Sequence, residues 1–180
     1  MGIVRKLHQS GLTVDHSFDI RERIDFYERL CLQHGGIPFE DYEKVRGWMN
    51  ELMDRLDQMD RPQCLCHIDA NVDNFLMFED GSAKLLDWEY AGMCDPIMDI
   101  SMSAIYSYYD AEQTEKLLEI YLERKPSEEE YYSVFANAAL GGFLWCLWAV
   151  YKAALGEEFG EYTIIMYRYA KGYYKKLKAL

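Results

Sequence analysis

Residues 66–76 of this chain read CHIDANVDNFL, and the order of polar side chains in this stretch decides how the whole chain is interpreted. His67, Asp69 and Asn74 stand at the spacing His-x-Asp-x4-Asn, and Asp87 follows them in the stretch LLDWEY. A single Asp or Asn in a turn is usually only a solvated loop residue. The ordered set of all four is much rarer and therefore carries most of the information in the sequence.

Around this stretch the hydrophobic pattern changes from helical spacing to the pattern of short strands. Residues 64–66 form one short strand candidate, and residues 74–78 and 83–88 form two more. The segment Glu79-Asp80-Gly81, which joins the last two, is typical of a hairpin turn. The sequence therefore predicts a β-hairpin directly after the polar stretch.

The polar side chains are expected at the ends of these strands. Asp69 follows the first strand, Asn74 opens the second and Asp87 closes the third. Glu89 shares a face with Asp87 if the extended conformation continues. Two carboxylates and an amide oxygen suit Mg²⁺, which takes few protein ligands and fills its shell with water and phosphate oxygens. We predict Asn74, Asp87 and Glu89 as metal ligands, and Asp69 remains to orient or deprotonate a hydroxyl.

The same order and spacing occur in the catalytic loop of kinases and the metal-binding Asp after it. The sequence therefore predicts phosphotransferase chemistry, with Mg²⁺ as cofactor and ATP as co-substrate. The alternative for these residues is an acidic hairpin rim that is merely solvated. A zinc site at Cys64-x-Cys66-His67 is disfavoured, because metal-binding cysteines usually stand further apart and no second pair follows. We expect Cys64 and Cys66 to be a buried strand pair.

The rest of the chain shows the periodicity of amphipathic helices. Asp19 to Glu22 reads as a capping box, and Ser127 with Glu130 reads as a second one. Helices are predicted at residues 1–9, 19–33, 39–59, 97–109, 111–124, 127–152 and 159–177. We predict one mainly α domain of the α+β class, helical with a small catalytic β-hairpin near its middle.

Composition limits the partners of the chain. Its 180 residues include 31 acidic and 19 basic side chains, for a formal net charge of -12, which argues against nucleic acid and anionic membranes as partners. The 5 cysteines show no disulfide-scaffold spacing and no signal peptide opens the sequence, so we expect a cytoplasmic protein. Residues 134–151 are nearly all apolar. We interpret them as a buried core helix rather than a membrane helix, because Trp145 and Trp148 lie inside the segment.

Four stretches carry a resemblance to a known family. CHIDANVDNFL, LLDWEYAG, DPIMDIS and FLWCLWAVYKAALGEEFGEY lie between residues 66 and 162. They resemble the C-terminal lobe of choline kinases of the bacterial lipopolysaccharide-modification type, within the wider choline/ethanolamine kinase and aminoglycoside phosphotransferase superfamily. The resemblance implies a single protein-kinase-like C-lobe over residues 1–180, with the catalytic loop and hairpin at 64–90 and substrate-pocket helices at 97–178.

The resemblance also implies a role for each motif residue. Asp69 would be the catalytic residue that accepts or orients the hydroxyl proton, and His67 would brace the loop. Asn74 and Asp87 would hold Mg²⁺ and, through it, ATP. Glu89 would assist through water.

Three further acids lie near this motif. Asp95 and Asp99 match family acids near the site, and we interpret Asp99 as a helix N-cap or a loop brace. Many superfamily members carry Pro-Gly before the metal-binding Asn, where this chain has Val72-Asp73. Asp73 is therefore a candidate for an extra metal-facing carboxylate.

Trp145 and Trp148 are the candidate substrate-binding residues. They stand three positions apart and share one face of a helix, and aromatic rings bind quaternary ammonium groups through cation–π attraction. An aromatic stripe on an apolar helix is more often core, but the resemblance places both residues in the choline pocket. Tyr106, Tyr109 and Tyr162 are candidates for its further walls.

We therefore expect transfer of the ATP γ-phosphoryl group to the hydroxyl of choline. A kinase for ethanolamine, another amino alcohol or an aminoglycoside is one alternative, and a non-catalytic choline-binding remnant is another. Such a kinase needs a second lobe with a Gly-rich loop, and no Gly-x-Gly-x-x-Gly occurs here. We expect the N-lobe to be absent, the isolated chain to have little turnover, and the lobe interface to be exposed or used in self-association.

Overall fold

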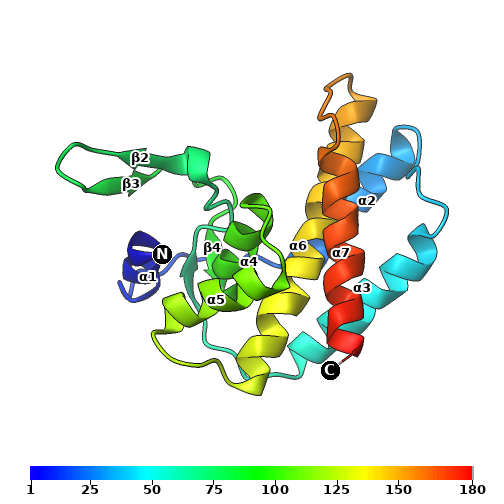
Figure 1. Cartoon of the computed structure of the whole chain (residues 1–180). Coiled ribbons are helices and arrows are strands. Elements are labelled where there is room, and N and C mark those ends of the chain that lie inside the picture. The colour runs from blue at the N-terminus through cyan, green and yellow to red at the C-terminus, as the bar shows by residue number, and fades with distance from the viewer. Residues whose placement is uncertain (180) are drawn as a thin grey trace. The chain divides into compact units, whose positions relative to one another are not determined.

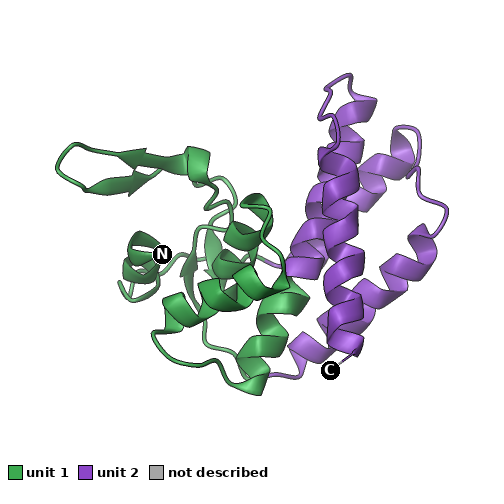
Figure 2. Cartoon of the chain, in the orientation of Figure 1, with its two compact units in different colours: residues 1–18, 60–137 green, residues 19–59, 138–180 purple. Residues whose placement is uncertain are grey.

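The computed structural model describes residues 1–179, and their contacts divide the chain into two compact units (Figure 2). Unit 1 consists of residues 1–18 and 60–137, and unit 2 consists of residues 19–59 together with the chain from residue 138 onward. Helix α6 (Glu128–Ala154) begins in unit 1 and ends in unit 2. Each unit therefore combines two stretches that are far apart in the sequence.

Unit 1 combines helices with two small antiparallel sheets. Its elements are α1 (Gly2–His8), β1 (Cys64–Cys66), the 3-10 turn η1 (Val72–Asn74), β2 (Phe75–Met77), β3 (Ala83–Leu85), β4 (Gly92–Cys94), α4 (Ile97–Tyr106), α5 (Ala111–Leu122) and the first part of α6. Strand β1 pairs with β4, and β2 pairs with β3 (Figure 1). Helix α4 is buried over nearly its whole length and forms the centre of this unit.

Strand β4 is an element that the sequence pattern does not predict. It pairs with β1 so that Cys64 lies opposite Cys94 and Cys66 lies opposite Gly92. A Cβ atom at Gly92 would lie 2.7 Å from the backbone nitrogen of Phe18. The glycine therefore allows the chain before α2 to run directly beside this strand.

Strands β2 and β3 form the predicted hairpin, which projects from the rest of unit 1 (Figure 1). Phe75 lies opposite Leu85. The Phe78 N–H donates to the Ser82 carbonyl at 2.9 Å, and Gly81 adopts a φ of 78° that suits a glycine in a tight turn. The turn sequence therefore predicted the position of the hairpin correctly.

The end of this hairpin differs from the prediction. Regular pairing stops at Leu85, and Asp87 adopts a left-handed conformation with a φ of 59°. The condition under which Asp87 and Glu89 would share a face, a continued extended strand, is therefore not met. Alternation of side chains requires an extended backbone, and the chain turns at Asp87 instead.

Unit 2 is helical. Its elements are α2 (Ile20–Gln33), α3 (Tyr42–Asp57), the last part of α6 and α7 (Tyr162–Lys178). The Asp19 carboxylate accepts the N–H of Arg21 at 2.8 Å and that of Glu22 at 3.2 Å, which confirms the predicted start of α2. Helices α6 and α7 approach closely at Gly142, where a Cβ would lie 2.8 Å from the carbonyl oxygen of Met166.

Helix α6 is long and apolar enough to cross a membrane, and its most apolar 18-residue window has a mean hydropathy of 1.6. In its most apolar window, however, 94% of the residues are buried inside the structure, which favours a core helix. The helix starts at the predicted capping box, because the Ser127 N–H donates to the Glu130 carboxylate at 2.8 Å and the Glu130 N–H donates to the Ser127 hydroxyl at 3.2 Å.

Candidate active site

The loop after β1 has a strained backbone that one buried carboxylate holds in place. Ile68 is fully buried and adopts a φ of 71°, which β-branched residues rarely do. The Asp99 carboxylate accepts the N–H of Ile68 at 2.6 Å and the N–H of His67 at 2.9 Å. Asp99 is therefore a loop brace and not a helix cap, since α4 begins at Ile97 with Pro96 in the cap position.

Asp95 is a second buried brace behind the loop. Its Oδ1 accepts the N–H of Ile97 at 2.9 Å, and its Oδ2 accepts the Ser133 hydroxyl at 2.9 Å. The Arg61 guanidinium lies 3.4 Å from the same oxygen. Asp95 thus fixes the start of α4 to the first part of α6.

His67 is fully buried, and its contacts reach both neighbours of Asp87. Its Nε2 donates to the Leu86 carbonyl at 2.8 Å, and its ring packs edge-to-face against Trp88 with 4.7 Å between ring centres. A buried imidazole that holds residues 86 and 88 is suited to positioning Asp87. The bracing role of His67 stays a prediction, and these contacts are the ones that such a role needs.

Asp69 and Asn74 are brought together as the sequence predicts. The Asn74 Nδ2 donates both to the Asp69 carbonyl and to the Asp69 carboxylate, each at 2.8 Å. Because the amide nitrogen is used in this way, the Asn74 Oδ1 remains available as an acceptor. Asn71 donates to the other Asp69 oxygen at 3.2 Å and accepts the N–H of Asp73 at 2.8 Å. The bond from the Asp73 N–H to Asn71 caps η1 at its start. This turn holds Val72-Asp73, the positions at which the resemblance leads us to expect Pro-Gly.

The two remaining predicted metal ligands lie on the surface. The Asp87 and Glu89 side chains are exposed, and the Leu86 N–H, next to Asp87, donates to the Asn74 carbonyl at 2.9 Å. Within the described residues, Asp69, Asp87 and Glu89 do not form a group of three acids close enough to share one ion. An exposed carboxylate and an oriented amide oxygen fit Mg²⁺ nevertheless, because this ion keeps several waters and uses few protein ligands.

The predicted aromatic residues of α6 and α7 belong to unit 2. Trp145 is buried, with 4% of its surface exposed, whereas Trp148 is half-buried. Their rings are perpendicular, with 6.2 Å between centres. Trp148 also packs against Phe159 at 4.9 Å, and Phe159 against Tyr162 at 6.5 Å. The Nζ of Lys152 lies 5.9 Å from the Trp148 ring centre, so a cation already approaches this ring.

Phe159 is an aromatic residue of this group that sequence reasoning missed. It lies before α7, although the pattern predicted a helix starting there, and helical spacing gives no information outside a helix. Tyr106 and Tyr109 are both half-buried and lie in unit 1, at the end of α4 and just after it. The predicted substrate residues are thus divided between the two units.

Comparisons with known proteins agree with this geometry. The profile of the family described as "Phosphotransferase enzyme family" matches residues 2–134. Two forms of Protein LicA from Haemophilus influenzae are each 31% identical to the chain over 167 residues. The matched region covers 88% of this chain but only 61% and 48% of these relatives.

Solved structures give the same result. The choline kinase LicA from Streptococcus pneumoniae is 30% identical, with a TM-score of 0.83 and coverage of 97% of this chain and 61% of its own. LicA in complex with AMP gives a TM-score of 0.84 at 30% identity, with coverage of 97% and 60%. A choline/ethanolamine kinase family protein from Mesorhizobium loti is 27% identical, with a TM-score of 0.77 and coverage of 98% and 59%. The predicted kinase-like fold is therefore confirmed, over part of the length of these relatives.

Proposed function

Because the chain belongs to the phosphotransferase enzyme family, we propose that it is the catalytic-loop lobe of a kinase that transfers the γ-phosphoryl group of ATP to the hydroxyl of choline. The observation that carries this proposal is the pairing of Asp69 with Asn74, in which the amide leaves its oxygen available as a ligand. The relatives that include a choline kinase and an AMP complex support the choice of substrate and nucleotide.

Few side chains would carry out the proposed phosphoryl transfer. Phosphoryl transfer depends mainly on positioning and on neutralising charge. Asn74 and Asp87 would hold Mg²⁺, with Glu89 acting through water, and Mg²⁺ supplies the charge that balances the phosphates. Asp69 would accept or orient the proton of the attacking hydroxyl. His67 would keep the segment of Asp87 in place through Leu86.

The substrate assignment depends on the rings of unit 2. A quaternary ammonium group has no N–H to donate, so aromatic faces are its main means of recognition. Trp148, Phe159 and Tyr162 offer such faces, and the Lys152 ammonium group over the Trp148 ring supports the attraction of that ring for a cation. A primary ammonium such as that of ethanolamine would instead need hydrogen-bond acceptors around it. Ethanolamine is the second candidate substrate, and it belongs to the same class of amino alcohols.

We expect the 180-residue chain alone to turn over little substrate. Its sequence contains no Gly-rich phosphate loop, and it spans about 61% of the matched LicA relative. The β2–β3 hairpin exposes apolar side chains, with 45% of Leu76 and 65% of Met77 accessible. This surface is suited to an N-lobe or to a second copy of the chain. A cytoplasmic location, without nucleic acid or membrane partners, remains part of the proposal.

Titration calorimetry of the purified chain with choline tests the substrate. We expect choline to bind, and Trp148→Ala to weaken that binding by about 2- to 30-fold, the equivalent of one cation–π contact. Trp48→Ala is the matched control, because Trp48 stacks on Tyr174 elsewhere in unit 2. Unchanged choline binding in Trp148→Ala would contradict the proposal that this ring binds choline. Tighter binding of ethanolamine than of choline would make ethanolamine the proposed substrate.

Binding of Mn²⁺, used in place of Mg²⁺, tests the catalytic loop. We expect Mn²⁺ with an ATP analogue to broaden the amide NMR signals around residues 74 and 87, and expect Asn74→Ala to remove the effect. Asp80→Asn, at the exposed hairpin turn, is the control. Choline binding without nucleotide binding would favour the non-catalytic module. Turnover of choline at about 1–100 s⁻¹ by the chain alone would refute the predicted inactivity.

A further inference from the structure

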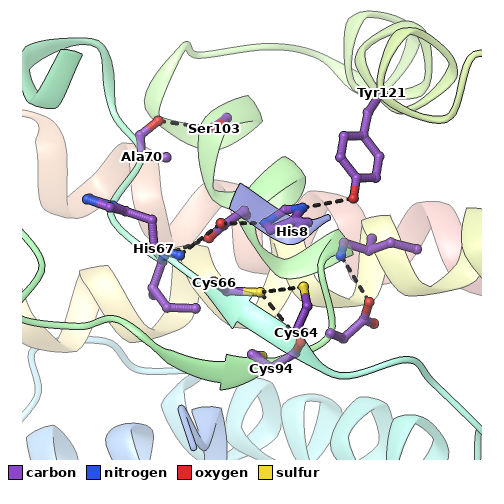
Figure 3. A network of polar contacts seen from close by, with 12 residues as sticks. His8, Cys64, Cys66, His67, Ala70, Cys94, Ser103 and Tyr121 are labelled. Atoms are coloured by element: carbon purple, nitrogen blue, oxygen red, sulfur yellow. Dashed lines mark hydrogen bonds and ion pairs between the residues drawn. The ribbon is translucent and has the colours of Figure 1, made fainter. Parts of the chain in front are cut away.

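The structure brings together three potential metal ligands that the proposed kinase chemistry does not use. His8 from α1 and the cysteines Cys64 and Cys66 from β1 place their ligand atoms within 4.8 Å of one another (Figure 3). We infer that these three residues form a binding site for a soft divalent cation such as Zn²⁺. The third ligand is His8 and not His67, which is why the sequence spacing alone did not favour a zinc site.

The geometry of the two sulfurs fits this inference. Cys64 and Cys66 stand two apart on a strand, so their side chains share one face of the sheet. Their sulfur atoms are 3.7 Å apart. Two thiolates at about 2.3 Å from a tetrahedral Zn²⁺ would be separated by about 3.8 Å. The pair is therefore already spaced as two corners of such a site.

The imidazole is held in a way that suits a ligand. The His8 side chain is 3% exposed, with its Nδ1 2.8 Å from the Tyr121 hydroxyl and its Nε2 2.9 Å from the Asp99 carboxylate. A ligating histidine commonly keeps a hydrogen bond from its other ring nitrogen to a carboxylate or another oxygen. Whichever nitrogen binds the ion, the other retains one of these two partners.

Charge and access also favour a cation. Cys64 is half-buried and gives a route from solvent, whereas Cys66 is buried. Two thiolates and a neutral imidazole would balance a divalent charge inside the protein. Sulfur and imidazole ligands prefer Zn²⁺ to Mg²⁺, so this site would not compete for the magnesium of the candidate active site.

The cluster is linked to the catalytic loop. The Asp99 oxygen that contacts His8 also accepts the N–H of His67, and its partner oxygen accepts the N–H of Ile68. An ion bound at His8 and β1 would therefore join α1, β1 and this loop. We expect it to stabilise unit 1, because a ligand that binds only the folded state raises the free energy of unfolding.

Titration of the full chain with Cd²⁺, in a reductant without thiols, tests the site. We expect one Cd²⁺ per chain with a sulfur-to-metal charge-transfer absorption, its displacement by Zn²⁺, and a higher unfolding midpoint with the ion bound. Cys64→Ser should weaken Cd²⁺ binding by about tenfold or more, and Cys146→Ser, a buried thiol in unit 2, should leave it unchanged. An absent absorption band, or one that survives Cys64→Ser, would overturn the site.

Two measurements on the unaltered chain cover the case in which a variant does not fold. The ¹¹³Cd chemical shift reports the ligand set directly, and we expect a value typical of two sulfurs with nitrogen. Zn²⁺ should also protect Cys64 and Cys66 from alkylation, as mapped by peptide mass spectrometry. A shift typical of oxygen ligands only, or equal alkylation with and without Zn²⁺, would reject the inference.

Discussion

The two units bury different kinds of side chain. Among residues 1–179, all buried Asp, His, Asn, Ser and Thr side chains lie in unit 1. These residues are His67, Asp95, Asp99, Ser101, Ser103, Thr114, Ser133 and Asn137. The core of unit 2 is built from apolar and aromatic residues, such as Phe143 stacked on Tyr42. The unit that carries the candidate active site thus has the polar interior.

This difference has a physical reason. A strained loop needs directional partners, and the two oxygens of a buried carboxylate supply them to adjacent N–H groups. In unit 2 the tyrosines keep their hydroxyls at the edge of the core, where Tyr167 donates to Asp41 at 2.9 Å and Tyr174 donates to Glu51 at 2.7 Å. These hydrogen bonds join α7 to α3 from the edge of the core and leave its interior apolar. Apolar packing suffices to hold helices, whereas positioning a loop requires hydrogen bonds.

The largest expected effect is that of Asp99→Asn, which preserves volume but replaces one acceptor oxygen with an amide group. The amide oxygen that remains can accept only one of the N–H groups of His67 and Ile68, so the other faces an N–H donor. A buried donor without an acceptor costs about 1–3 kcal/mol. We expect the free energy of unfolding to fall by about 3 kcal/mol in urea denaturation. Hydrogen exchange should locate the loss of protection in unit 1.

Asp54→Asn is the control for this variant, because Asp54 is an exposed residue of α3 that pairs with Arg21 at the surface. It should change the free energy of unfolding by no more than about 0.5 kcal/mol. If the two substitutions lowered the free energy of unfolding equally, the buried carboxylate of Asp99 would matter no more for stability than an exposed one. Loss of protection in unit 2 alone would contradict its role in holding the loop of unit 1.

The second effect should be that of Gly142→Ala, which tests packing in the apolar unit. The added Cβ would lie 2.8 Å from the Met166 carbonyl oxygen and 3.1 Å from the Ala170 nitrogen, both backbone atoms of α7. Overpacking of this kind costs about 1–3 kcal/mol. We expect the loss in unit 2, measured by the same two methods.

Gly172→Ala in α7 is the matched control. Among residues 1–179, no atom beyond the adjacent residues and the backbone of α7 itself lies within 4 Å of a Cβ at that position. Replacing a helical glycine by alanine stabilises a helix by about 0.5–1 kcal/mol. The two substitutions should therefore have opposite signs. If Gly142→Ala also stabilised the chain, close helix packing would not be what distinguishes unit 2.

Local signals in the sequence predicted most of the helices and the hairpin. Capping at Asp19 and at Ser127 and the turn around Gly81 each depend on a few neighbouring residues, so they can be seen in one sequence. Strand β4 could not be predicted, because it has three residues and its partner β1 lies far away in the sequence. The contact of His8 with Asp99 is equally distant. Residues brought together only by the folded chain escape pattern analysis.

The candidate site was predictable in part for the same reason. Asp69 and Asn74 stand five positions apart within one loop, and their pairing followed from the motif. The conformation of Asp87 depends instead on contacts of its neighbours Leu86 and Trp88 with His67, across the loop. A pattern of alternating residues contains no information about such a turn.

The third effect should be that of Tyr167→Phe, which removes a hydroxyl at the edge of unit 2. Its hydrogen bond to Asp41 is only partly buried, so we expect a loss of about 0.5–1.5 kcal/mol. This is smaller than the effect of Asp99→Asn, although both changes preserve most of the side-chain volume. A loss from Tyr167→Phe that equalled or exceeded that of Asp99→Asn would show that unit 2 also depends on polar positioning.

The smallest effect should be a pH-dependent one at the start of α6, on the surface of unit 1. The Arg124 guanidinium, and after it the Ser127 N–H, lower the pKa of Glu130 in the folded chain. A carboxylate with a lowered pKa contributes stability above its unfolded value of about 4.3, and this contribution is lost as the pH falls through the folded value.

Glu130→Gln should therefore cost about 0.5 kcal/mol at pH 7, because a partly exposed ion pair contributes little, and should cost nearly nothing at pH 3. Urea denaturation of both proteins at the two pH values measures the difference. The glutamine can keep a hydrogen bond to the Ser127 N–H, so the variant isolates the charge. A cost at pH 7 comparable to that of Asp99→Asn would mean that surface charge, and not the buried carboxylate, gives unit 1 its polar character.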